Sequence, residues 1–150
     1  MSQATAKSKA LTDFRKALTP LFETHGFSVV RRKFVRSNGS VTQQISSRKH
    51  LDLDDRFFIE WNMEVTVLER GQELRSFLQF LLDRELFDSV MMAPYGPADV
   101  EAAVRWHTYW LQKRVLVVAD RLFDPLLAME YNDEVRARVE DSVNLLLYRD

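Results

Sequence analysis

Hydrophobic and polar residues alternate one by one between positions 56 and 68. One set of alternate positions is apolar throughout and consists of Phe57, Ile59, Trp61, Met63, Val65 and Val67. The positions between them are polar in the middle of the segment, at Glu60, Asn62, Glu64 and Thr66. Successive side chains of a β-strand point to opposite faces of the sheet. The segment therefore predicts a long strand with one buried and one solvated face, onto which the helices pack.

Two shorter segments before this strand also have strand character. Residues 27–36 predict a first strand, with a bulge near residues 31–32 because the alternation changes phase there. Asn38-Gly39 favours a tight hairpin turn, since both residues accept positive φ angles. Residues 41–48 predict the second strand, and the polar residues 49–55 predict a loop into the long strand. Three strands joined by short links indicate an antiparallel meander.

An amphipathic helix is predicted before the strands. Its apolar residues recur at spacings of three and four from about Ser8, and Gly26 marks its end. Pro20 lies inside the pattern and should kink the helix or mark a new first turn. Residues 1–7 are polar and predict a flexible tail.

Helical periodicity dominates after the long strand. A second helix is predicted from Leu74, Phe77, Leu78, Leu81 and Leu82, fraying towards Phe87. Residues 98–123 predict a long helix that is apolar on more than one side, as a central helix would be. Asn132 is placed to cap a last helix, whose stripe is Val135, Val139, Val143 and Leu146.

These elements predict one α+β domain over residues 1–150. A three-stranded antiparallel meander is expected to be packed on one face by about four helices. Residues 1–7 would be the tail, residues 8–69 the first helix and the meander, and residues 72–150 a helical part.

Composition indicates the cellular compartment in which the protein is expected. The chain is 46% hydrophobic and has no cysteine, which excludes disulfides and thiol chemistry and fits a reducing compartment. The N-terminus lacks the apolar core of a signal peptide, and no apolar run is long enough for a bilayer. We therefore expect a cytoplasmic protein without a membrane partner.

Charge is divided unevenly along the chain. Residues 1–50 carry ten Lys and Arg against Asp13 and Glu23, a net charge of +8, whereas residues 51–98 have a net charge of −6. Two interpretations remain open: the basic segment forms a surface that meets a partner, or the acids of the long strand neutralise it across the sheet. Under the first interpretation the candidate binding residues are Arg31, Arg32, Lys33, Arg36, Arg48 and Lys49.

Four short segments of the first half form a recurring type of pattern: residues 17–27 (ALTPLFETHGF), 31–39 (RRKFVRSNG), 42–46 (TQQIS) and 57–65 (FFIEWNMEV). In these segments the chain resembles a small bacterial domain family of unknown function. The second half, with a long helix before residues 123–127 (FDPLL), is similar in layout. Some members of that family are similar in size and setting to immunity proteins, which bind and block a toxin. The resemblance implies no reaction and supplies no catalytic residues.

Candidate chemistry in the residues is sparse. The nearest approach to a metal cluster is His50 with Asp52, Asp54 and Asp55. The glycine and glutamate of a calcium loop are missing, so we expect no metal and no cofactor. Glu60 and Glu64 are expected to pair with Arg31, Lys33 or Arg36 across the sheet. His107 lies on an apolar helix face and is expected to be a hydrogen-bonded core or boundary residue.

Three functions are compatible with this sequence. The leading hypothesis is a non-catalytic protein-binding module, of the immunity or antitoxin type, that occludes a partner such as a toxin or effector. The second is a nucleic-acid-associated protein that uses the basic hairpin around residues 31–49, with affinity that falls steeply with salt. The third is a small enzyme with a site between helices and sheet that combines His107 with Glu60.

Overall fold

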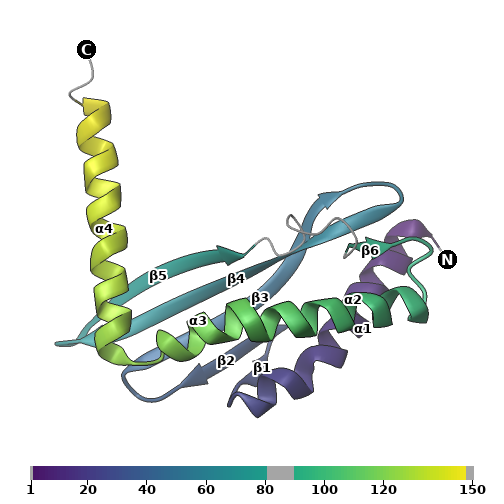
Figure 1. The fold of residues 1–150 in the computed structure, drawn as a ribbon, viewed down its shortest axis with the longest axis horizontal. Coiled ribbons are helices and arrows are strands. Elements are labelled where there is room, and N and C mark those ends of the chain that lie inside the picture. The colour runs from purple at the N-terminus through teal and green to yellow at the C-terminus, as the bar shows by residue number, and fades with distance from the viewer. Residues whose placement is uncertain (1, 81–89, 148–150) are drawn as a thin grey trace.

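The computed structural model describes residues 2–80 and 90–147, with side chains to residue 138 (Figure 1). Its elements in chain order are α1 (Gln3–Thr24), β1 (Ser28–Val30), β2 (Lys33–Ser37), β3 (Val41–Asp52), β4 (Arg56–Glu69), β5 (Gln72–Phe80), β6 (Met91–Met92), α2 (Pro97–Trp110), the π-helical segment η2 (Leu111–Val115), α3 (Leu116–Arg121) and α4 (Pro125–Leu147). The α+β class predicted from the sequence is confirmed.

The sheet is larger than the predicted three-stranded meander. In the described residues it has six strands in the order β1-β2-β3-β4-β5, with β6 beside β4, and every pairing is antiparallel. The long strand of the prediction is β4, and it lies between β3 and β5. Strand β3 continues to Asp52, so part of the expected loop 49–55 is also strand.

The first extra strand comes from residues 27–36. They form the hairpin β1–β2 rather than one bulged strand, and Arg31 and Arg32 make its turn with φ angles of 50° and 68°. Two successive positive φ values are the geometry of a tight hairpin turn, which is usually built from Asn or Gly. The change of phase was therefore real, but it reflects a reversal of the chain and not a bulge.

The second extra strand, β5, replaces the first half of the helix predicted after Gly71. Gly71 has a φ of 78° in the turn that follows β4, and Gln72–Phe80 then pairs with β4 along its length. Within the strand Leu74, Ser76 and Leu78 share the face of the apolar residues of β4. Pairing with β4 thus decided between a strand and a helix. The remainder of the predicted helix lies outside the described residues.

One face of the sheet, called here the inner face, carries the core. The apolar residues of β4 and Ile45 of β3 pack there with Phe14 and Phe22 of α1 and with Leu111 and Leu116 of the long helical stretch. That stretch is α2, η2 and α3 in succession, so a long helical segment lies where one was expected at residues 98–123, although it ends at Arg121 and one of its sides is exposed. Since α1 and α2 also contact each other, both layers close over one core.

Two helix boundaries differ from the prediction. Helix α1 begins at Gln3, where the Ser2 side chain accepts a hydrogen bond from the backbone of Thr5, and it continues through Pro20. Helix α4 begins at Pro125, so Asn132 is an interior residue of α4 and the prediction that it caps the helix is wrong. Figure 1 shows α4 rising away from the sheet next to β5.

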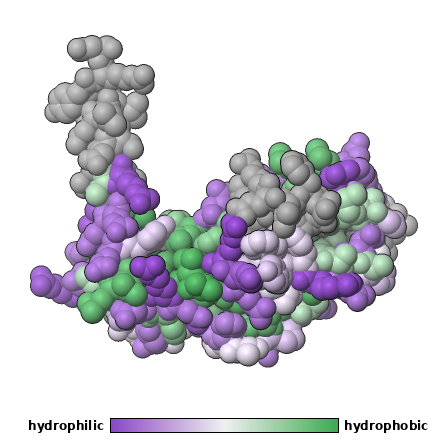
Figure 2. All heavy atoms as spheres, viewed as in Figure 1, coloured by the Kyte–Doolittle hydropathy of each residue, from purple (hydrophilic) through white to green (hydrophobic). Residues whose placement is uncertain are grey.

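The surface seen in Figure 2 is mostly hydrophilic, with apolar side chains gathered where α3 meets the base of α4. Val117 of α3 and Leu126 of α4 are exposed. No helix of the described residues is both long and apolar enough to cross a bilayer.

Candidate binding surface

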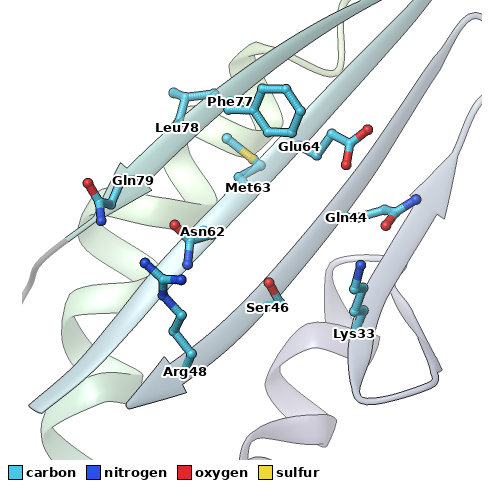
Figure 3. Close-up of a pocket in the computed structure, with 10 residues that line it drawn as sticks. All are labelled: Lys33, Gln44, Ser46, Arg48, Asn62, Met63, Glu64, Phe77, Leu78 and Gln79. Atoms are coloured by element: carbon cyan, nitrogen blue, oxygen red, sulfur yellow. The ribbon is translucent and has the colours of Figure 1, made fainter. Parts of the chain in front are cut away.

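The face of the sheet opposite the core, called here the outer face, contains an open hollow of about 470 Å³ (Figure 3). Alternate positions of four neighbouring strands supply the outer-face side chains of its lining, because the antiparallel register aligns them in rows across the sheet, and Met63 and Leu78 lie between these positions. One row joins Gln44, Glu64 and Phe77, and the next joins Ser46, Asn62 and Gln79. The complete lining is Lys33, Gln44, Ser46, Arg48, Asn62, Met63, Glu64, Phe77, Leu78 and Gln79.

Phe77 is the most exposed of the large apolar side chains of the sheet that are described. It is 68% exposed and stands on β5 beside Glu64. Figure 3 shows its ring at the edge of the hollow, above the polar side chains of β3 and β4. An aromatic ring left in water among amides and charges is a common feature of protein-binding surfaces.

Glu60 anchors one end of the outer face. Its side chain is 0% exposed although it lies on the solvated side of β4. It accepts hydrogen bonds from Arg48 and Gln79 and, at 3.2 Å, from the side-chain amide of Asn62. Burial by itself raises the pKa of Glu60, but the hydrogen bonds from Arg48 and Asn62 outweigh it and hold the pKa below its ordinary value. Glu60 is therefore a charged anchor that orients three residues of the hollow.

Glu60 and Glu64 of β4 form ion pairs with residues of the two neighbouring strands. Glu60 pairs with Arg48 of β3, and the Glu64 carboxylate lies 3.7 Å from Arg75 of β5. The predicted pairing of these acids with Arg31, Lys33 or Arg36 is wrong, because β3 separates β2 from β4.

The six basic residues proposed from the sequence do not form one patch. Arg31 and Arg32 form the exposed turn of the β1–β2 hairpin, Lys33 and Arg48 line the hollow, and Lys49 lies 3.4 Å from Asp52. Their role in binding stays a prediction.

Arg36, the sixth residue, lies on the inner face and is 8% exposed. Its guanidinium sits between the rings of Phe27 and Phe123, at 4.4 and 4.2 Å from their centroids. It donates to Gln43 at 2.8 Å and lies 3.0 Å from an oxygen of Asp120. These contacts join β2 to α3, so Arg36 holds the sheet to the helices.

His107 is a core residue, as expected from its apolar helix face. Its Nδ1 accepts a hydrogen bond from Nε1 of Trp61 at 3.1 Å, and its ring packs edge-on against Phe14. Glu60 lies on the opposite face of β4. The two groups that the enzyme hypothesis combined are therefore not brought together.

Phe77 was missed as a surface residue because its spacing predicts a place in the apolar stripe of a helix, and Arg75 and Gln79 were missed as residues of the sheet for the same reason. Leu74, Ser76, Leu78 and Phe80 occupy every second position, which is the spacing of one face of a strand. The leucines that follow Phe80 also fit a helical period and obscured this strand pattern. Gln44, Ser46 and Asn62 are uncharged, and only their alignment across strands identifies them.

Comparison with known proteins leaves the family open. No protein-family model, no curated protein and no solved structure matches the chain. The resemblance to the bacterial family of unknown function stays a prediction.

Proposed function

We propose that this protein is a non-catalytic protein-binding module that recognises its partner with the outer face of the sheet. In the manner of an immunity protein or antitoxin, it would occlude a functional surface of a toxin or effector. The exposed ring of Phe77 beside the hollow carries the proposal.

The lining of the hollow supports recognition of a polypeptide. Gln44, Asn62 and Gln79 present amides that can donate and accept, Lys33 and Glu64 present opposite charges, and Phe77 supplies apolar area. Such a mixture of one aromatic anchor with a polar surround is typical of protein interfaces. The Glu60 network holds Asn62, Gln79 and Arg48 in place, which lowers the entropy lost on binding.

The experiment is an affinity capture from native lysate, with and without nuclease, using three forms of the protein. Phe77→Ala removes the exposed ring of the hollow, and Leu126→Ala removes a comparably exposed apolar side chain from α4. We expect one stoichiometric protein to survive nuclease treatment and to bind Phe77→Ala about 30-fold more weakly, since truncation of an interface anchor costs about 2 kcal/mol. Leu126→Ala should bind like the wild type.

Equal affinity of the partner for Phe77→Ala and the wild type would refute the outer face as the binding surface. Unfolding curves test whether weaker binding comes from a loss of folded protein. Both substituted side chains are exposed, so each substitution should change the free energy of unfolding by less than about 0.5 kcal/mol.

One observation favours a nucleic-acid-associated function as a second candidate. Arg31, Arg32 and Lys33 form no ion pair with a described residue, so their charge is available. In the same capture, loss of all bound material after nuclease treatment would support this candidate.

A further inference from the structure

A groove of about 190 Å³ runs between α1 and the β1–β2 hairpin. Helix α1 contributes one wall and the hairpin the other, and the lining is Thr12, Arg15, Lys16, Thr19, Val29, Arg32 and Phe34. Val29 pairs with the buried Phe34, which places the groove on the inner side of the sheet. It is thus separate from the hollow of the outer face.

The groove follows an open sheet edge. Strand β1 is the terminal strand and, within residues 2–80 and 90–147, pairs with β2 alone. In a hairpin with a two-residue turn, Val30 and Lys33 exchange hydrogen bonds across the ladder, so the next pair, Val29 and Phe34, does not. The backbone N–H and C=O of Val29 therefore point to the open edge, where an added strand would find them.

The walls of the groove carry positive charge without an opposing acid in the lining. Arg15 donates to the Ser47 side chain at 3.1 Å and to the Ser47 carbonyl at 2.7 Å, and Lys16 and Arg32 form no ion pair with a described residue. Burial, and then the nearby charge of Arg32, lower the pKa of the Arg15 guanidinium. An anion between Arg15 and Arg32 would relieve this repulsion.

We propose that this groove binds an extended acidic segment of a partner protein, which adds to β1 as a further antiparallel strand. Its backbone pairs with Val29, and alternate acidic side chains face Arg15, Lys16 and Arg32. The half-exposed Val29 side chain, 52% exposed, gives the segment an apolar contact. This site does not depend on the outer face being a binding surface.

A nucleic acid fits the groove less well. Phe34 is the one aromatic residue in its lining and is 4% exposed, so bases find no ring on which to stack. The open backbone edge of β1 also suits a peptide strand, because only a peptide offers matching N–H and C=O groups.

The test uses a fluorescein-labelled peptide of about ten residues in which Glu alternates with Val or Thr. Its control peptide has Gln in place of every Glu, and an oligothymidylate is the nucleic-acid probe. We expect the acidic peptide to bind in fluorescence anisotropy and the Gln peptide to bind at least about tenfold more weakly, since its groove contacts are uncharged.

Variants of this chain then locate the peptide. Lys16→Gln and Arg32→Asn should each weaken binding about fivefold, the worth of one favourable ion pair. Arg31→Asn is the matched control, because it removes the neighbouring charge of the same turn outside the groove and Asn also tolerates a positive φ. Val29→Pro removes the outward N–H and should abolish binding, whereas Val29→Thr keeps that N–H and should not.

Several results would overturn the proposal. These are no binding of the acidic peptide, equal binding to Lys16→Gln, Arg32→Asn and the wild type, or loss of peptide binding in Phe77→Ala, which leaves the groove intact. Preferential binding of the oligothymidylate, falling steeply between about 50 and 200 mM salt, would assign the groove to nucleic acid instead. If Val29→Pro fails to fold by circular dichroism, the two charge variants decide.

Discussion

At the scale of single residues, Glu60 shows how a charge can be buried on the solvated side of a sheet. Arg48, Asn62 and Gln79 satisfy its oxygens, and the Arg48 side chain itself reaches into solvent. The cost of desolvating the carboxylate is offset by charge-assisted hydrogen bonds, which are stronger than neutral ones.

Glu60→Gln tests this arrangement through pH. The pKa of Glu60 is lower in the folded protein than its ordinary value of 4.5. Its ionised form therefore stabilises the fold above pH 4.5, and this contribution is lost as pH falls through the folded pKa. In urea unfolding near pH 7 the variant should lose about 2 kcal/mol of unfolding free energy, and the deficit should shrink in acid.

Glu64→Gln is the matched control for that measurement. Glu64 lies on the same face of β4, four residues after Glu60. The 3.7 Å contact between its carboxylate and the exposed Arg75 is worth less than about 0.5 kcal/mol. A deficit for Glu60→Gln that is independent of pH would contradict the ionised network.

At the scale of elements, α4 is tied to the edge of the sheet by one buried polar residue. Asn132 donates to the Arg75 carbonyl at 3.0 Å and to the Ser76 hydroxyl at 2.9 Å. Both acceptors belong to β5, so the contact fixes the helix that follows Pro125 against the outermost long strand.

Asn132→Ala should lower the unfolding free energy by about 2 kcal/mol, because it leaves the buried acceptors of β5 without a donor. Asp133→Ala changes the exposed neighbouring position of α4 and should cost less than about 0.5 kcal/mol. Thermal unfolding measures both variants. Equal stability of the two would show that Asn132 does not hold α4 to β5.

At the scale of the whole molecule, different polar contacts join the helices to the sheet at its two ends. At the start of α1, Lys7 donates to the Asp52 carboxylate at 2.6 Å and to the Leu53 carbonyl at 2.7 Å, and the hydrogen bond that it donates to Asp52 raises the pKa of Lys7. At the other end, Arg36 joins β2 to α3. The basic N-terminal part and the acidic remainder thus meet in local pairs, while Arg15, Lys16, Arg31, Arg32 and Lys33 keep their charge free of described ion pairs.

Deletion of residues 1–7 tests the closure by α1. The sequence predicts a flexible tail at residues 1–7, whereas the structure places residues 3–7 in α1, with Ser2 as the cap. We expect the deletion to lower the thermal midpoint, since the cap alone is worth about 1 kcal/mol. Lys9→Ala, which breaks only an exposed pair with Asp13, is the control and should leave the midpoint unchanged.

The β1–β2 hairpin and β5 show why part of the sheet escaped prediction. Two consecutive arginines are poor turn formers by local preference, and only pairing of Ser28–Val30 with β2 fixes them there. For residues 74–78 the helical and strand patterns share Leu74 and Leu78, so the neighbour β4 decides.

The residues of the candidate surfaces could also be predicted from the sequence only in part. Candidates selected by charge, such as Arg48 and Lys33, line the hollow, but Arg36 has the same charge and lies in the core. Phe77 gives no local signal for exposure, because an apolar residue between strand and helix patterns is more often buried.

The sequence by itself determined what local periodicity and side-chain chemistry encode. These are the α+β class, a long strand expected at residues 56–68, a long helical stretch expected at residues 98–123, and His107 as a hydrogen-bonded residue of the core or its boundary. Only the tertiary structure decided which strands are neighbours. It thereby decided which side chains share the hollow, that Glu60 binds Arg48, and that the edge of β1 opens beside the cations of α1. The physical reason is that alternation specifies a face for each residue, while strand order and register depend on contacts between segments far apart in the chain.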